Sequence, residues 1–267
     1  MRRPATTAMR TLALLLALTA PAAAGDSLDE LLVRIGDRVE QLWKTFGAVT
    51  CTEHVAQSRF DKKGKMIHRQ ETTSDYLIFL QLIGGELAVE ESRVLQKELA
   101  PAKKKRPGQR ALLVTNGFSV MLLVFHPHFQ SSYVFTRVAD DEASERGLYR
   151  IDFEHVPGEK SPSVLQLKDR SYPLEWRGSA WIDSKDLSIV RVTTALREPL
   201  TEIGLEELDS EVTYGEISFE DSHQTYHLPT LATIDARTSR QSWRNVHEFT
   251  GYKRFSVSTE VTIGEPH

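Results

Sequence analysis

The feature that most constrains the fold of this chain is a long-range alternation of apolar and polar residues. In the run from Leu174 to Ile182 the even positions are small or apolar, and most of the odd positions are polar. From Arg254 to Ile263 the odd positions carry the apolar residues instead. A period of two places successive side chains on opposite faces of a β-strand, and one dry face with one wet face is typical of an antiparallel sheet. Both runs therefore predict half-buried strands.

Comparable patterns occur along most of the chain and predict a mainly β protein. We expect further strands at 48–60, 66–83, 86–96, 147–156, 187–196, 208–219 and 225–238, and Gly84-Gly85 is a two-residue hairpin signal. The alternation changes phase near Gly215 and near Gly251, which indicates β-bulges, and bulges bend strands. The prediction is one strongly curved antiparallel sheet, or half-open β-barrel, of about ten or eleven strands. Because helices do not alternate with the strands, Rossmann and TIM-barrel folds are excluded.

Two segments are predicted to be helical. Leu28 to Phe46 has apolar residues at spacings of three and four, Ser27 and Glu30 form a capping-box pair, and Gly47 is a good helix end. Residues 116–126 are compatible with either a hairpin at Asn116-Gly117 or a helix over Phe118–Phe125, because six consecutive apolar residues fit both. We favour a second helix, lying on the concave face of the sheet or at its mouth.

The first 24 residues are predicted to be a cleaved secretory signal peptide. Arg2, Arg3 and Arg10 surround or precede an apolar run, and Ala22–Ala24 supply the small residues of a cleavage site. The mature chain, 25–267, is then one domain in a periplasm or outside the cell, with no transmembrane segment. Cleavage removes three arginines and no acid, so the net charge falls from −4 to −7, which disfavours nucleic-acid binding. Cys51 is the single cysteine, so no internal disulfide can form, and we expect it to be buried.

A basic loop is expected near 97–110, where two prolines interrupt a run of lysines and arginines. The simplest interpretation is a mobile, solvated loop. The alternative is peripheral contact with an anionic membrane through Lys103, Lys104, Lys105 and Arg106.

No motif in the sequence specifies a reaction. The serine-nucleophile, zinc-helix, phosphate-loop and dinucleotide-binding signatures are absent, so we expect no enzyme, no catalytic residue and no cofactor. The histidine pairs His126/His128 and His223/His227 are interpreted as ordinary polar residues, because a metal site needs three or four converging ligands. His155 and His247 lie on predicted strands, where we expect them to pair with carboxylates or water.

Bulky apolar side chains on the predicted strands and second helix are the candidate ligand contacts. Core packing is the simplest interpretation of such residues, and the alternative is the wall of a cavity, because ligand pockets are also mostly apolar. The candidates are Trp176, Tyr214, Phe249, Phe255, Leu122 and Phe125.

The plan of an exported chain with an opening amphipathic helix, long curved strands and one more helix resembles the bacterial lipoprotein-carrier superfamily of the LolA/LolB type. The resemblance is architectural and implies a half-barrel that holds acyl chains under helical lids. Other segments are similar to exported acidobacterial proteins without an assigned function, which implies no activity. Those segments are Phe125–Gln130, Tyr172–Trp176, Gly178–Asp183, Arg240–His247 and Tyr252–Phe255.

Three functional hypotheses follow. The leading one is a non-catalytic, exported carrier or binder of a lipid or of lipoprotein acyl chains, held on the concave face of the sheet. The second is a structural or protein-interaction module of the cell envelope, whose interior is filled by its own side chains. A metal-dependent hydrolase is the third and would need three ligands near one histidine pair.

Overall fold

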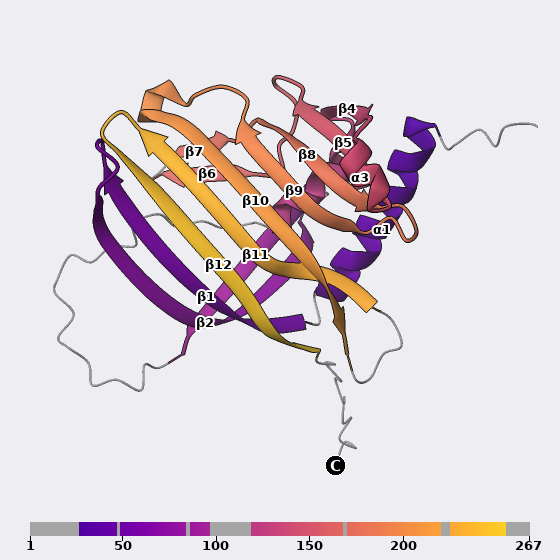
Figure 1. Ribbon diagram of the computed structural model, residues 1–267, viewed down its shortest axis with the longest axis horizontal. Helices are drawn as coiled ribbons and strands as arrows, with labels where there is room; N and C mark the ends of the chain where they lie inside the picture. The colour runs from indigo at the N-terminus through magenta and orange to yellow at the C-terminus, as the bar shows by residue number, and fades with distance from the viewer. Residues whose placement is uncertain are drawn as a thin grey trace, which may run out of the picture.

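The computed structural model describes residues 27–46, 49–83, 86–96, 119–167, 170–219 and 225–254. Its main feature is a ten-stranded antiparallel sheet in the order β3-β2-β1-β12-β11-β10-β9-β8-β5-β4. The sheet is not closed: β3 and β4 form its two edges. Strand β1 pairs with β12, so the first and last strands of the described chain meet in the middle of the sheet. The predicted fold, a mainly β protein with one curved antiparallel sheet, is confirmed (Figure 1).

The ten strands of the large sheet are β1 (Val49–Asp61), β2 (Met66–Ile83), β3 (Glu86–Leu95), β4 (Tyr133–Val138), β5 (Leu148–His155), β8 (Trp176–Asp183), β9 (Ile189–Leu196), β10 (Leu205–Ser218), β11 (Thr225–Thr238) and β12 (Gln241–Arg254). A separate hairpin consists of β6 (Val164–Leu167) and β7 (Arg170–Pro173). The helical elements are α1 (Leu28–Phe46), η1 (Ser119–Phe125), α2 (Pro127–Gln130), α3 (Asp141–Glu145) and η2 (Thr201–Ile203).

Most predicted strands are found within a few residues of their expected bounds, whereas β4, β6 and β7 were not predicted. These three strands have four to six residues each, too few for a clear period of two. Ile83 pairs with Glu86, as expected for a two-residue connection between β2 and β3. The strand predicted for 254–263 lies outside the described residues after Arg254, and so do the signal peptide, the basic loop at 97–110 and Gly47.

Both predicted bulges correspond to register shifts, one of them on a different strand. Thr50 pairs with Lys253 and Thr52 with Thr250, so β12 has an extra residue where Gly251 adopts a φ of 61°. Glycine occupies this left-handed conformation without the steric cost that other residues meet. Near Gly215 the prediction was wrong in detail, because the extra residue is Thr230 on the partner strand β11. Gly215 provides space there, since a Cβ atom on it would lie 2.7 Å from the Thr230 methyl group.

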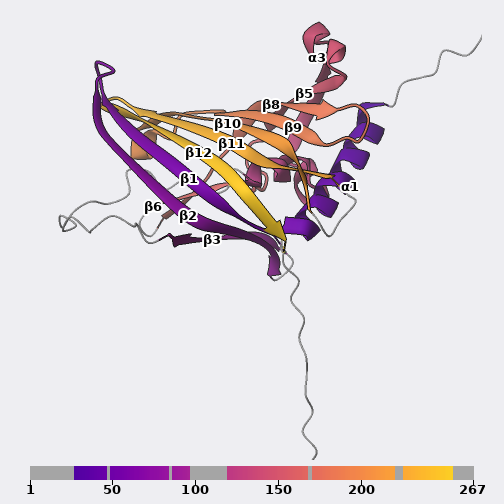
Figure 2. The ribbon, with the colours of Figure 1, turned by 60° about the horizontal axis from the view of Figure 1, so that its bottom comes forward.

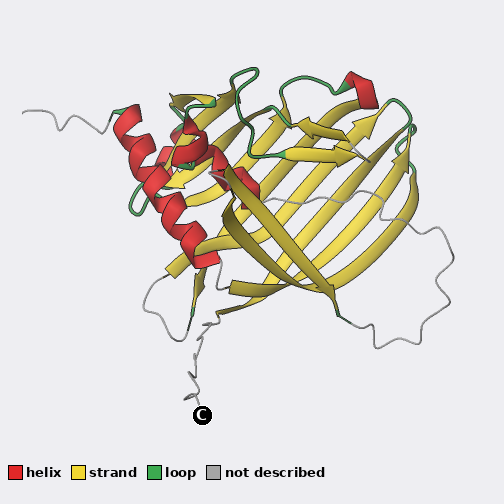
Figure 3. Ribbon diagram, turned by 180° about the vertical axis from the view of Figure 1, so that it is seen from behind, coloured by secondary structure: helices red, strands yellow, loops and turns green. Residues whose placement is uncertain are grey.

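Helix α1 closes one end of the concave side of the sheet, as Figures 2 and 3 show. The capping box is confirmed: Ser27 Oγ accepts from the Glu30 N–H at 3.3 Å, and Glu30 Oε2 accepts from the Ser27 N–H at 3.0 Å. The buried side chains of α1 include Leu31, Ile35 and Trp43, and they face η1 and the ends of β1 and β2.

The second predicted helix exists, but it is a 3₁₀ helix followed by one turn of α-helix at α2. Segment η1 contacts α1 on one side and β9 on the other. Residues 121–125 are therefore all buried, which explains why their sequence shows neither a helical nor a strand period.

Candidate ligand-binding site

A pocket of about 280 Å³ lies between α1 and the adjoining end of the sheet. Its apolar wall comes from α1, η1, the β8–β9 turn, the start of β9 and β11. It consists of Val39, Leu42, Leu122, Leu187, Ile189 and Tyr226. Its polar wall consists of Arg38, Gln41, Ser188 and His227. The volume is just below the roughly 300–1,000 Å³ of pockets that bind small molecules, and the lining is divided about equally between polar and apolar surface.

Leu187 reaches this pocket from an unusual backbone conformation. Its φ of 60° makes it the single non-glycine residue with positive φ in the described part of the chain. It ends the turn between β8 and β9, where its N–H donates to the Asp183 carbonyl at 3.0 Å. A leucine in the left-handed region costs about 1–3 kcal/mol, and such strain concentrates at functional sites. The Leu187 side chain is 6% exposed and belongs to the hydrophobic core as well as to the pocket wall.

The polar rim of the pocket is organised by Asp186. Its carboxylate accepts from the Ser188 N–H at 2.9 Å and from the Ser188 hydroxyl at 2.8 Å. Arg38 Nη2 and His227 Nδ1 face Asp186 Oδ2 from further away, at 3.8 and 3.9 Å. Burial alone raises the pKa of Asp186, but the bonds from Ser188 and the attraction of His227 and Arg38 outweigh it and lower that pKa. The carboxylate therefore stays charged, and the hydrogen bonds from Ser188 are its main stabilising contacts.

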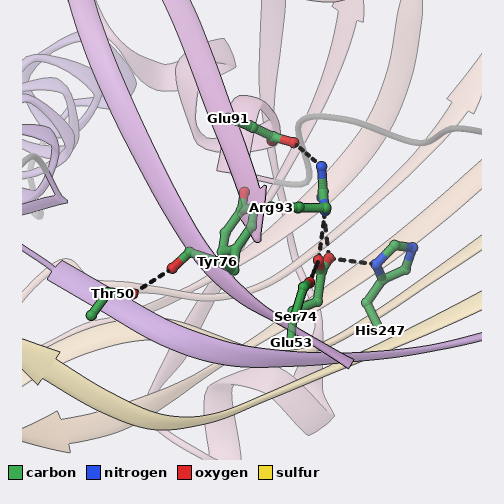
Figure 4. Close-up of polar contacts among 7 residues, drawn as sticks. All are labelled: Thr50, Glu53, Ser74, Tyr76, Glu91, Arg93 and His247. Atoms are coloured by element: carbon green, nitrogen blue, oxygen red, sulfur yellow. Dashed lines mark hydrogen bonds and ion pairs between the residues drawn. The ribbon is translucent and has the colours of Figure 1, made fainter. Parts of the chain in front are cut away.

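A second polar feature lies on the concave face of the other half of the sheet (Figure 4). We call it the Glu53 cluster: Glu53 on β1, Ser74 on β2, Glu91 and Arg93 on β3, and His247 on β12. Glu53 has 0% of its surface exposed, and His247 has 2%. Glu53 accepts from Arg93 Nε at 2.5 Å and from the Ser74 hydroxyl at 3.3 Å, and it lies 2.8 Å from His247 Nδ1. Arg93 also donates to Glu91 at 2.8 Å.

The Glu53 cluster compensates its own buried charge. Burial alone raises the pKa of Glu53, but hydrogen bonds from His247 and Arg93 and the attraction of the guanidinium hold it below its usual value. Burial likewise acts to lower the pKa of Arg93, while Glu53 and Glu91 together raise it. The expectation that His247 pairs with a carboxylate is confirmed. The cluster joins four adjacent strands, β12, β1, β2 and β3, and fixes their relative positions.

The other histidines of interest have structural roles. His126 Nδ1 accepts from the His128 N–H at 3.2 Å, so His126 caps the short helix α2. His155 Nε2 lies 3.2 Å from the Lys160 carbonyl, and its ring contacts Tyr133 edge-on. Among the described residues, no group of three or more His, Cys, Asp or Glu side chains is arranged to hold a metal ion.

The predicted ligand contacts lie in separate places, and their contact with a ligand remains a prediction. Leu122 lines the pocket beside α1. Phe125 and Trp176 are buried in the core, where the Phe125 ring lies 5.3 Å from that of Phe135. Tyr214 and Phe249 belong to the same buried core, and the Phe249 ring lies 5.7 Å from that of Tyr76. Phe255 and the basic residues 103–106 lie outside the described residues.

Sequence reasoning did not identify Arg38, Leu187 or His227 as pocket residues. In the sequence, Arg38 occupies a polar position of an amphipathic helix, and Leu187 is the first residue of a predicted strand. Only the packing of α1 against the β8–β9 turn and the start of β11 brings them together. One sequence feature could have drawn attention to Leu187: it is an apolar residue directly after Asp183–Asp186, a stretch with strong turn character.

Cys51 is buried, as predicted, and lies on the concave face of β1. Burial raises the pKa of its thiol to about 12. The thiolate is the reactive form of cysteine, so this thiol is inert at neutral pH.

A larger hollow of about 1,070 Å³ lies on the outer face of the sheet. Strand β8 shows the alternation: Trp176, Ala180 and Ile182 are buried on the inner side, whereas Arg177 and Ser179 line the hollow. Ion pairs such as Arg244–Asp235 at 2.7 Å and Arg197–Glu154 at 3.3 Å cross it. The lining combines these charged side chains with a larger area of apolar atoms.

Comparisons with known proteins add a distant similarity. No protein-family model matches the chain, and no curated protein matches it in sequence. A crystal structure from Vibrio parahaemolyticus, provisionally described as an outer membrane lipoprotein-sorting protein domain, is similar over 85% of this chain and 94% of that chain. The identity is 11% and the TM-score 0.38, so the similarity concerns the general fold and carries no argument about ligand or partner. Among the described helices, none is long and apolar enough to cross a membrane.

Proposed function

We propose that this protein is a non-catalytic, exported binder or carrier of an apolar ligand, a lipid or an acyl chain, held between α1 and the sheet. The observation that carries the proposal is the pocket of about 280 Å³ with its apolar wall. Burying an acyl chain there would contribute about 0.8 kcal/mol per methylene. Helix α1 would act as the lid, since it contributes Val39 and Leu42 to the wall and lies at one end of the sheet.

The strained Leu187 supports the same proposal. A glycine or asparagine would satisfy the turn at lower cost, and neither would present an apolar surface to the pocket. Burial of Leu187 in the core offsets the cost of this conformation, and the same side chain provides part of the apolar wall.

The test begins with the mature protein purified from the exported fraction without detergent. Native mass spectrometry followed by lipid extraction should reveal a co-purifying acyl species at close to one per chain. A mass equal to the bare chain, unchanged after incubation with lipids, would contradict the proposal.

A matched pair of variants locates the ligand. Leu42→Trp fills the pocket from α1, whereas Val33→Trp places the same side chain on the solvent face of α1, where Val33 is 60% exposed. We expect Leu42→Trp to lose the bound species and Val33→Trp to retain it. Equal occupancy in both variants would place the ligand elsewhere.

An envelope interaction module is the second candidate, and one observation favours it. Trp176 and Phe125 are 2% and 0% exposed, so the protein's own side chains fill this part of the inner side of the sheet. A ligand-free chain in the mass measurement, together with retained folding, would make this the better account.

A further inference from the structure

We infer that the ligand of the pocket beside α1 is a single-chain amphiphile whose head group presents acceptor oxygens, and that Arg38 and His227 bind this head group. The inference rests on the proposed function, because it names the chemistry of the ligand at the same site. It follows from two hydrogen-bond donors on the polar wall of the pocket, Arg38 and His227, whose contacts with the described residues are long.

Arg38 is the first of these groups. It lines the pocket from α1, and its closest polar contacts are long: 3.5 Å to the Ser188 hydroxyl and 3.8 Å to Asp186 Oδ2. A guanidinium has five N–H donors in a planar fork that matches carboxylate, ester and phosphate oxygens. At these distances the described residues use little of its hydrogen-bonding capacity, and its side chain is 35% exposed, so a ligand could reach the remaining donors.

His227 is the second group. Its side chain is 11% exposed, and within the described part of the chain the buried Nδ1 atom has no hydrogen-bond partner. The Asp186 oxygen at 3.9 Å is beyond hydrogen-bond distance. A buried polar atom without a partner is costly, and an oxygen bound between His227 and Arg38 would satisfy both residues.

Asp186 limits the choice of head group. Its carboxylate is already bonded twice by Ser188, so it does not need the ligand as a donor. Glu216 lies opposite His227 in the register of β10 and β11, so a second acidic residue is nearby. These acids partly offset the positive charge of Arg38, so the shared requirement is acceptor oxygens rather than a particular net charge. A fatty acid carboxylate and an ester carbonyl both supply such oxygens.

The test compares four probes with one chain length: dodecanoate, methyl dodecanoate, dodecylamine and dodecane. Binding is measured by native mass spectrometry and by competition with a fluorescent lipid probe. We expect the two oxygen-bearing probes to bind about tenfold or more tightly than the amine and the alkane, as bonds to a charged donor imply. Comparing dodecanoate with its methyl ester then separates a free acid from an esterified lipid.

Variants assign the effect to residues. Arg38→Met should remove the preference for acceptor oxygens while dodecane still binds, whereas Arg34→Met, one turn away on α1 and outside the pocket lining, should leave it unchanged. Asp186→Asn should tighten dodecanoate. His227→Phe should weaken both oxygen-bearing probes.

The outcomes separate this inference from the proposed function. Equal binding of all four probes, or tighter binding of dodecylamine, would overturn the inference and leave the apolar carrier intact. If none of the probes binds to the folded protein, the proposed function fails, and the inference fails with it.

Discussion

At the scale of single residues, the Glu53 cluster shows how a buried charge is tolerated in this sheet. Glu53 is fully buried, yet Arg93, Ser74 and His247 all contact its carboxylate. Removing one member of such a cluster costs more than the cluster contributes as a whole, because the remaining charge stays buried without its partner. The net contribution of the cluster to stability is therefore smaller than the loss that follows when one member is removed.

Glu53→Gln is expected to lower the free energy of unfolding by about 3–5 kcal/mol, since Arg93 loses its main partner. Glu71→Gln is the control, because Glu71 pairs with Arg69 on an exposed surface and should cost less than about 1 kcal/mol. Urea denaturation of both variants measures the difference. Similar losses of unfolding free energy in the two variants would show that the buried Glu53 contributes no more to stability than the exposed Glu71.

The same carboxylate predicts how stability depends on pH. The pKa of Glu53 in the folded protein is below its usual value of 4.5, so its contribution is fully present above that pH and is lost as the pH falls through the folded pKa. Unfolding free energies measured from pH 6 downward should fall less steeply for Glu53→Gln than for the parent below about pH 4.5. Parallel curves would contradict the prediction.

At the scale of elements, α1 approaches the Phe125–Gln130 segment closely at Gly36. A Cβ atom on Gly36 would lie 2.7 Å from Gln130 Nε2 and 3.2 Å from the Phe125 carbonyl oxygen. The Gln130 amide uses this space to donate to the Leu32 carbonyl at 2.7 Å and to the Phe125 carbonyl at 2.8 Å. The segment Phe125–Gln130 therefore docks α1 onto η1, which gives the His-Pro-His-Phe-Gln stretch a packing role.

A double-mutant cycle tests this docking. Gly36→Ala favours an isolated helix by about 1 kcal/mol, but we expect a net loss of stability, because the new methyl group displaces Gln130. Gln130→Ala alone should also destabilise the protein, and the two losses should add to more than the loss in the double variant. Thermal unfolding of the four proteins measures the coupling. Simple additivity would show that Gly36 and Gln130 act independently.

At the scale of the whole molecule, the edge strands and the interior strands of the open sheet differ in how many of their backbone groups are paired. In the described residues β4 pairs only with β5, whereas β11 is bonded on both sides by β10 and β12. An edge strand leaves a row of backbone groups unpaired. Helix α1 covers one end of the concave side, and among the described strands none pairs with the outer side of β3 or β4.

Hydrogen–deuterium exchange should reflect this asymmetry. About half of the β4 amides should exchange rapidly, because alternate N–H groups of an edge strand point away from its single neighbour. The amides of β11 should be among the slowest. Protection of β4 equal to that of β11 would indicate that another chain covers this edge in solution.

Much of the fold follows from local pattern. The amphipathic period of α1, the Ser27–Glu30 cap, the long strands β1, β2 and β11 and the bulge at Gly251 are each encoded within a few neighbouring residues. Short strands such as β4 and β6 and the 3₁₀ character of η1 were not predictable, because their conformation depends on what covers them. The same limit applies to predicted ligand contacts such as Trp176, whose apolar character cannot distinguish a core from a cavity wall.

One amphipathic helix and a curved antiparallel sheet could be predicted from the sequence, since helical and strand periods are properties of consecutive residues. Which residues meet depends on how these elements pack. Arg38, Leu187 and His227 converge because α1 packs across strand ends that are distant in sequence, and Glu53 meets His247 because the first strand pairs with the last. Side-chain convergence depends on register and packing, and no local pattern records either.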